Sequence, residues 1–314
     1  MHLVIGAAGY AGRYAIAALG ERFPVRGLEP GPDLAAALAG VDTVHMAAEL
    51  HPPTTRLSPG QGPHPFLVEL VRLASEAGVR RLVHLSTAQV LGPAPRGVLL
   101  ESSPLRPDHA YEKLHARDER WLLARPGLEV VVLRPAQGFG RGEPIVTQLL
   151  ARLAAGRPQL VRRGHARRTF LAGSDLGRAF VAAALRGRTG HAYLLGGFES
   201  TWRDLLTTAA RALRLPARLL EVPYDLAYLT AAVRERLTPR GQECWPNPYG
   251  VDLLGRAHVL EDGLSRRELS WSPLVGSFEE GVAELAEWFR KSRASLVEPE
   301  PQRPGGQAPD DVTA

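Results

Sequence analysis

The sequence begins Met1-His-Leu-Val-Ile-Gly-Ala-Ala-Gly-Tyr-Ala-Gly12, and this stretch decides the fold. The apolar run from Leu3 to Ile5 predicts a buried parallel strand, and apolar residues at helical spacing from Tyr14 onward predict a helix. The glycines between them, at positions 6, 9 and 12, permit a tight turn and a close approach of a pyrophosphate to the N–H groups of the helix N-terminus. The pattern therefore predicts a dinucleotide-binding turn. The alternative is a glycine-rich turn that binds nothing.

Composition places the chain among globular proteins and narrows its environment. With 314 residues, of which 45% are hydrophobic, the chain can bury a full core. A single cysteine, Cys244, excludes an internal disulfide and favours a reducing compartment. No apolar run has the length of a membrane span, and the N-terminus is a strand rather than a signal segment, so we expect a cytoplasmic protein without a membrane partner.

The net charge of +5 comes from scattered arginines, with few aromatic residues between them. This pattern favours a solvated surface or a subsite for an anionic small molecule over a nucleic-acid surface. We expect no nucleic-acid partner and no metal site.

The second expected strand, residues 23–29, ends in an acidic residue that bears on the choice of cofactor. Dinucleotide folds place an acid near the adenosine ribose, and Glu29 lies close to that position. A carboxylate there favours NAD, because it repels the 2′-phosphate of NADP. Arg13 and Arg26 favour the opposite choice, and Glu29 is equally compatible with a plain surface position. The following interval, 30–40, has room for one brief helix only, whereas a doubly wound domain normally has a further helix and strand there.

Later segments continue the alternation of strands and helices. Core strands are expected at 41–48, 82–87 and 128–134, and helices at 66–77, 144–155, 176–185 and 224–237. Ser174 or Asp175 is a candidate N-cap for the third of these helices. The pattern predicts an α/β fold with a doubly wound parallel sheet.

Six blocks in a fixed order resemble the extended short-chain dehydrogenase/reductase family. The resemblance is to its NAD(P)-dependent sugar epimerase/dehydratase group and to the 3β-hydroxysteroid dehydrogenase-like proteins. It covers the chain from Leu3 to about Phe289, and the blocks that carry it are residues 6–12, 41–48, 79–88, 133–140, 168–176 and 267–273.

The resemblance implies a Rossmann domain, mainly residues 1–198, and a smaller C-terminal substrate lobe, mainly residues 199–293, to which residues 143–168 contribute. The Pro-, Gln- and Gly-rich acidic tail, 294–314, is expected to be disordered. The resemblance also implies a homodimer and NAD or NADP as cofactor. The cofactor-binding residues expected on this basis are Gly6, Gly9, Tyr10, Ala11, Gly12, Glu29, Ala47, Ala48 and Pro135.

The resemblance further implies a catalytic set of a hydroxyl residue, a tyrosine and a lysine. Thr87 matches the hydroxyl residue, which orients the substrate, and Tyr111 matches the tyrosine, which is the general acid/base. The family pattern Tyr-x-x-x-Lys places His115 in the lysine position, with Glu119 where the family has a glutamate. Lys113 is only two residues from Tyr111, ~200° around a helix, and is expected to face away.

Three departures from the family pattern leave two functions open. An imidazole carries less positive charge at pH 7 than a lysine, so His115 is a weakened substitute, and the family's asparagine and a second tyrosine correspond to Pro63 and Leu91. One hypothesis is an NAD(P)-dependent oxidoreductase or epimerase that acts on a hydroxyl or carbonyl carbon of a sugar-nucleotide or sterol-like molecule. In it, Arg167 or Arg168 anchors an anionic substrate. The other is a family member with impaired catalysis that binds a dinucleotide as a regulatory or scaffold protein.

Overall fold

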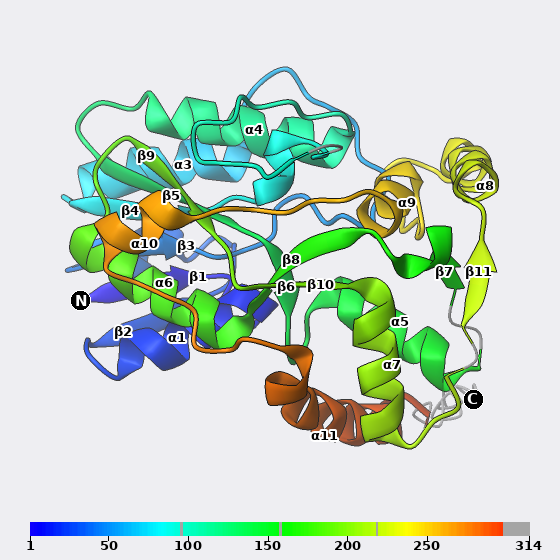
Figure 1. Cartoon of the computed structure of the whole chain (residues 1–314). Helices are drawn as coiled ribbons and strands as arrows, with labels where there is room; N and C mark the ends of the chain where they lie inside the picture. Colours follow the sequence, from blue (N-terminus) through cyan, green and yellow to red (C-terminus); the bar gives the residue numbers. More distant parts are fainter. Residues whose placement is uncertain (95–96, 157–158, 218, 298–314) are drawn as a thin grey trace, which may run out of the picture.

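A six-stranded parallel sheet forms the centre of the protein (Figure 1). The computed structural model describes residues 1–94, 97–156, 159–217 and 219–297. The strand order is β2-β1-β3-β4-β5-β9, and each neighbouring pair is parallel. The strands are β1 (His2–Ile5), β2 (Val25–Leu28), β3 (Thr43–Met46), β4 (Arg81–Leu85), β5 (Glu129–Pro135) and β9 (His191–Leu195). The expected α/β fold of Rossmann type is confirmed.

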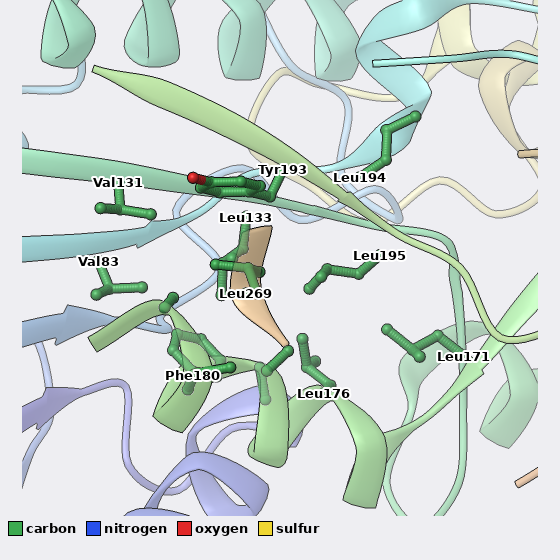
Figure 2. Packing of buried hydrophobic residues seen from close by; sticks show 14 of the residues in the cluster. Val83, Val131, Leu133, Leu171, Leu176, Phe180, Tyr193, Leu194, Leu195 and Leu269 are labelled. Atoms are coloured by element: carbon green, nitrogen blue, oxygen red, sulfur yellow. The ribbon is translucent and has the colours of Figure 1, made fainter. Parts of the chain in front are cut away.

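Helices cover both faces of this sheet. Figure 1 shows α3 (Pro65–Glu76) and α4 (Ala110–Leu123) on one face and α1 (Tyr10–Gly20) and α6 (Gly173–Arg186) on the other. The apolar side chains between the sheet and α6 are almost fully buried, among them Val131, Leu133 and Phe180 (Figure 2). This packing on both faces fixes the positions of the strand ends.

The connection between β2 and β3 is as short as the sequence indicates. It contains the one-turn helix α2 (Leu34–Ala37), and β2 is the edge strand of the sheet as described. The chain thus leaves β1 for the edge and returns to pair β3 on the other side of β1. The carboxyl ends of β1 and β3 flank this reversal of strand order, which is where open α/β sheets bind their ligands.

A second group of elements packs beside the carboxyl edge of the sheet (Figure 1). Its core contains large aromatic side chains, including Phe139, Phe170 and Trp202. The elements outside the central sheet and its covering helices are β6 (Gln137–Phe139), β7 (Gln159–Val161), β8 (Arg167–Ala172), β10 (Phe198–Thr201), β11 (Leu220–Val222), η1 (Ala88–Leu91), η2 (Arg162–Gly164), α5 (Pro144–Ala154), α7 (Trp202–Leu213), α8 (Tyr224–Leu237), α9 (Pro248–Gly255), α10 (Gly263–Leu269) and α11 (Phe278–Val297).

Two expectations differ from the structure in detail. Helix α6 begins at Gly173 with Ala172 as its N-cap residue, so neither Ser174 nor Asp175 caps it. The Asp175 carboxylate instead accepts hydrogen bonds from the backbone N–H groups of Leu274 and Val275. Residues 294–297 belong to α11, and the rest of the tail expected to be disordered, 298–314, lies outside the described residues. The domain boundaries stay predictions.

No helix among the described residues combines the length and apolarity needed to cross a lipid bilayer.

The glycine turn after β1 depends on a very close backbone approach. A Cβ atom at Gly12 would lie 1.9 Å from the carbonyl oxygen of Gly6, and one at Gly6, whose φ is +85°, would lie 2.4 Å from the Cα atom of Ala48. Only glycine fits both positions. The turn therefore fixes the distance between α1 and the ends of β1 and β3.

We expect Gly12→Ala to lower the free energy of unfolding by ~1–3 kcal/mol, because the new methyl group overlaps the Gly6 carbonyl. The measurement is urea unfolding followed by circular dichroism. Gly20→Ala is the matched control, because a Cβ atom at Gly20, at the other end of α1, has no heavy atom within 4 Å. Equal stability of the two variants would show that the close approach is not a constraint.

Candidate active site

The glycine turn presents the N-terminus of α1 to the carboxyl edge of the sheet. Gly9 is the N-cap residue, no side chain caps this helix end, and its first turn contains no acidic residue. A Cβ atom at Gly9 would meet only the Gly6 carbonyl oxygen, at 3.2 Å. The cradle therefore fits the pyrophosphate of a dinucleotide, which unpaired N–H groups and a positive helix end attract. The Tyr10 hydroxyl donates a hydrogen bond to the Phe139 carbonyl at 3.1 Å and so ties α1 to β6.

Glu29 and the two arginines that bear on the cofactor lie in different surroundings. The Glu29 carboxylate accepts a hydrogen bond from the Ala8 N–H at 2.7 Å, so it lies against the glycine turn itself. Arg26 donates instead to the Ala37 carbonyl at 3.0 Å. The Arg13 guanidinium lies close to Gly142, beyond the other end of the turn. Of these three side chains, only Glu29, which directly follows β2, contacts the backbone of the glycine turn.

A cavity of about 270 Å³ extends from this turn to the residues expected to be catalytic. Of the predicted cofactor-binding residues, Gly9, Tyr10, Ala11, Ala47 and Pro135 line it, and Ala48 packs behind against Gly6. Polar side chains also line the cavity, namely those of Glu49, Thr87, Gln89, Tyr111, Glu143 and Tyr249. The structure therefore brings most of the predicted cofactor-binding residues and two predicted catalytic residues to one cavity.

Helix α4 sets the relative positions of Tyr111 and His115. The two residues lie one turn apart on the same face, with ring centroids 4.6 Å apart, and His115 is buried behind Tyr111. Lys113 lies on the exposed side of the helix. His115, and not Lys113, therefore occupies the place beside the tyrosine, as helical geometry predicts.

Glu49 is the residue of this site that the sequence analysis missed. The Tyr111 hydroxyl donates a hydrogen bond to Glu49 Oε2 at 3.2 Å, and His115 Nε2 lies 3.2 Å from Glu49 Oε1. The backbone N–H of His51 donates to the same Oε1 atom at 3.0 Å. One signal was present in the sequence: Glu49 directly follows the Ala-Ala pair that ends the strand region 41–48, at the ligand-binding edge of the sheet.

The surroundings keep the Tyr111 proton on its hydroxyl. Burial, the Glu49 carboxylate and Tyr249 raise the pKa of Tyr111 well above its usual value, and a contact with the Thr87 hydroxyl opposes them. Partial desolvation raises the pKa of Glu49, whose side chain is still 42% exposed, but His115 and the His51 N–H outweigh this effect and hold the pKa below its usual value. At neutral pH the pair is therefore a phenol and a carboxylate.

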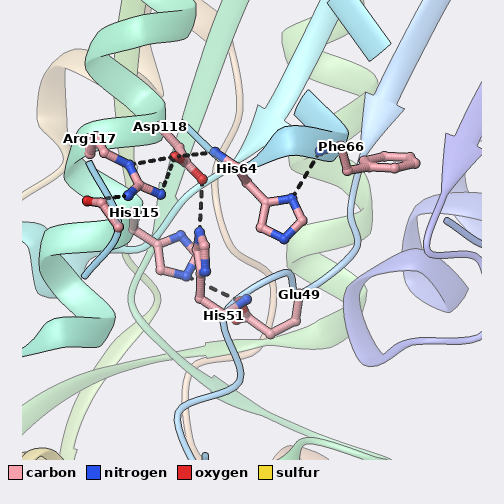
Figure 3. A network of polar contacts seen from close by, with 8 residues as sticks. Glu49, His51, His64, Phe66, His115, Arg117 and Asp118 are labelled. Carbon is pink, nitrogen blue, oxygen red and sulfur yellow. Dashed lines mark hydrogen bonds and ion pairs between the residues drawn. The ribbon is translucent and has the colours of Figure 1, made fainter. Parts of the chain in front are cut away.

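A buried polar network supports this pair from the α3 side (Figure 3). His51 Nε2 lies 2.8 Å from Asp118 Oδ2, and the His64 backbone N–H donates to Asp118 Oδ1 at 3.0 Å. On the face of α4 that packs against the sheet, the buried Glu119 pairs with the guanidinium of Arg134 and accepts a hydrogen bond from the Ser86 hydroxyl at 3.0 Å. These contacts fix α4 and the loop after β3, from which Tyr111 and Glu49 project.

Pro63 and Leu91 provide no polar group in place of the family's asparagine and second tyrosine. Pro63 lies in the loop before α3, and Leu91 is buried in η1. Among the described residues, no group of three or more histidine, cysteine, aspartate or glutamate side chains could hold a metal ion.

Of the two arginines proposed as anchors for an anion, one is buried and the other is not. Arg168, on β8, is 2% exposed; its guanidinium donates to the Gln89 side-chain oxygen and the Arg256 carbonyl, both at 3.4 Å. Its Nε atom has no hydrogen-bond partner in the described structure, and burial lowers the pKa of its guanidinium to about 10. Arg167 is exposed and pairs with Glu199. Arg168 lines a narrow cavity that shares Gln89, Tyr249 and Leu253 with the larger one.

The fold and this cavity define a Rossmann-type dinucleotide-binding protein with a tyrosine at its ligand site. The model of the NAD dependent epimerase/dehydratase family matches residues 2–196. The chain belongs to this family, which confirms the resemblance found in the sequence and the expected NAD(P) cofactor.

Similar proteins of known name support this family assignment. A dTDP-glucose 4,6-dehydratase from Streptomyces niveus is 30% identical over 235 residues, which are 72% of this chain and 62% of that protein. Sterol demethylase protein B from Methylococcus capsulatus is 29% identical over 237 residues, 71% of this chain and 70% of that protein. The aligned part thus spans less than two thirds of the Streptomyces niveus protein.

Solved structures share the fold. The dTDP-glucose 4,6-dehydratase DesIV from Streptomyces venezuelae, as a double mutant with NAD and DAU bound, has a TM-score of 0.71 at 24% identity over 94% of this chain and 98% of that one. A UDP-N-acetylglucosamine 4-epimerase from Methanobrevibacter ruminantium M1, in complex with UDP-N-acetylmuramic acid, has a TM-score of 0.73 at 17% identity over 93% and 98%.

A second carboxyl group in the cavity, that of Glu143, has an unusual environment. It caps α5 by accepting a hydrogen bond from the Val146 N–H at 2.6 Å and also accepts one from the Gln137 amide at 3.2 Å. Burial raises the pKa of Glu143 to about 7, against these hydrogen bonds. Near neutral pH this carboxyl group therefore exchanges a proton readily.

The Glu143→Gln variant tests this environment through the pH dependence of stability. Between pH ~4.3, the pKa of an unfolded glutamate, and pH ~7, the folded protein keeps a proton that the unfolded chain has lost, so stability falls by roughly 3 kcal/mol as pH rises. Above pH ~7 this contribution is constant. We expect Glu143→Gln to remove this part of the slope in urea unfolding between pH 5 and pH 8. If the free energy of unfolding depended on pH in the same way in the variant and in the natural protein, the raised pKa of Glu143 would be contradicted.

Proposed function

We propose that the protein is an NAD-dependent oxidoreductase or epimerase that acts on a hydroxyl or carbonyl carbon of a sugar nucleotide. The observation that carries the proposal is the single cavity that joins the glycine turn to Thr87 and Tyr111. A dinucleotide on the turn and a substrate oxygen at Tyr111 would share this cavity. When bound, the nicotinamide supplies a hydride acceptor or donor for the substrate carbon.

Each residue of the site has a defined task under this proposal. Gly9 and the first turn of α1 hold the pyrophosphate, and Ala47 and Pro135 shape the wall beside it. Tyr111 exchanges a proton with the substrate oxygen as general acid and base, and Thr87 orients that oxygen. His115 stands in the lysine position of the family as a weaker substitute.

The buried Arg168 favours a sugar nucleotide over a sterol-like substrate. Among the described residues Arg168 forms no ion pair, although Asp108, Glu112 and Asp252 line the same narrow cavity. An anionic ligand group at the guanidinium would supply the direct partner that it lacks. A nucleoside diphosphate provides such a group, and only Gln89, Tyr249 and Leu253, which line both cavities, separate the cavity of Arg168 from the larger one. A sterol has no anionic group to offer.

The alternative function, a dinucleotide-binding protein without catalysis, is favoured by the absent lysine and asparagine at positions 115 and 63. It predicts cofactor binding with no turnover of any sugar nucleotide. Turnover measurements therefore separate the two functions.

We expect NADH to bind at least about tenfold more tightly than NADPH, a difference of ~1.4 kcal/mol, because Glu29 lies against the glycine turn. The measurement is a titration of nicotinamide fluorescence. Glu29→Gln removes the repulsive charge and is expected to narrow the difference mainly by improving NADPH binding. Tighter binding of NADPH to the unchanged protein would reverse the assignment of Glu29.

Tyr111→Phe is expected to lower kcat by a factor of ~10²–10⁴, the usual contribution of a general acid or base. NADH affinity should change little, because the hydroxyl is not part of the glycine turn. The assay follows UDP-glucose or dTDP-glucose with NAD, and Tyr228→Phe, on α8 and outside the cavity, is the matched control. Unchanged turnover of Tyr111→Phe would refute its assigned role, and NADH binding without any turnover by the unchanged protein would favour the non-catalytic alternative.

A further inference from the structure

The hydroxyl group of Tyr111 has the Glu49 carboxylate as its hydrogen-bond partner, whereas the family pattern predicts a lysine near this tyrosine. We propose that Glu49 receives the Tyr111 proton while Tyr111 takes a proton from the substrate, and returns it in the reverse reaction. This proposal rests on the proposed function. It makes Glu49 a positioning and proton-accepting residue that acts through Tyr111.

The three contacts of Glu49 suit this role. Oε2 faces the Tyr111 hydroxyl at 3.2 Å, a distance over which a small movement completes proton transfer. Oε1 is held by the His51 N–H at 3.0 Å and by His115 Nε2 at 3.2 Å. One oxygen is therefore fixed by donors from two segments, which leaves the other directed at Tyr111.

The anion beside Tyr111 disfavours the phenolate form in which such a tyrosine usually acts. A cation beside the phenol would favour a phenolate, which takes the substrate proton directly. Here the neighbouring anion favours the neutral phenol. A neutral phenol can accept a proton only if it gives up its own at the same time, and Glu49 is the carboxylate placed to take it.

The proton balance closes within the site. As the substrate O–H bond breaks, its proton goes to Tyr111 Oη, and the Tyr111 proton goes to Glu49 Oε2. A bound oxidised nicotinamide would accept the substrate hydrogen with its electron pair, so the alcohol would become a carbonyl group. In the return step, with hydride supplied back to the carbon, the Glu49 proton passes through Tyr111 to the carbonyl oxygen. An epimerase needs this reversibility.

Several other titratable or polar groups surround Glu49 and Tyr111. His115 belongs to α4, His51 to the loop after β3, Thr87 precedes η1, and Tyr249 comes from α9. Behind them lie Asp118, which pairs with His51, and His84 on β4, which is buried with a pKa lowered to about 3 and so remains neutral. Glu112, Arg168 and Glu143 lie close enough to Tyr249 to influence its pKa, which burial raises.

The first test needs no substrate. Protein labelled with ¹³Cζ-tyrosine is titrated by NMR, and the Tyr111 signal is assigned from its loss in Tyr111→Phe. In the unchanged protein this signal should show an acid step as Glu49 ionises and should remain that of a phenol to about pH 10. In Glu49→Gln the acid step should vanish and Tyr111 should ionise at lower pH. Glu143→Gln, which removes another carboxyl group of the same cavity, should keep the acid step.

The second test is kinetic. With NAD and UDP-glucose or dTDP-glucose, Glu49→Gln should lower kcat by a factor of ~10²–10³ and abolish the loss of kcat at acid pH, because glutamine cannot accept a proton. Glu49→Asp, which keeps the carboxylate, should recover part of the rate together with the acid limb. A purely structural role would lower kcat without removing that limb.

Two results would overturn the proposal: a Tyr111 signal that titrates identically in Glu49→Gln, or a Glu49→Gln enzyme with the pH profile of the unchanged protein. If the unchanged protein turned over neither sugar nucleotide, the proposed function would fail, whereas the NMR titration would still decide whether Glu49 controls the Tyr111 proton.

Discussion

The close approach of backbone at the glycine turn is the constraint on which the rest of the structure depends. Gly12 lies against the Gly6 carbonyl, and Gly6 lies against Ala48 at the end of β3. These contacts bring α1, β1 and β3 together at the reversal of strand order. The loop that carries Glu49 begins at Ala48, so the spacing that prepares the phosphate cradle also places the partner of Tyr111.

Within this frame, Tyr111 stands where the family pattern predicts the tyrosine, and the charge beside it is negative. The buried His115 lies one helical turn from Tyr111, and the Glu49 carboxylate, from the loop after β3, contacts both. Such a carboxylate holds a proton on the phenol, whereas a lysine would help to remove it. Under the proposed roles, an anion therefore acts on the Tyr111 proton where the family pattern predicts a cation.

The parts of this structure that depend on neighbouring residues were predictable from sequence. The strand, glycine turn and helix at the N-terminus are local, and the spacing of 3.6 residues per turn correctly separates His115 from Lys113. Contacts between distant segments were not predictable. Glu49 meets Tyr111 across 62 positions, and Asp175 leaves the expected N-cap position because amides about 100 residues later bind its carboxylate. Periodicity has no information about such partners.

The edge strand β2 also affects whether the sheet can pair with the sheet of another copy of the protein. In the described part of the chain β2 is an edge strand, so one row of its backbone groups has no strand partner there, and such a row invites pairing with another chain. Here the strand has only four residues, one of them the charged Arg26, and it is preceded by Pro24 and followed closely by Pro30. Proline has no N–H to donate to a growing ladder. The short strand and its flanking prolines therefore disfavour edge-to-edge pairing of the sheet with another chain.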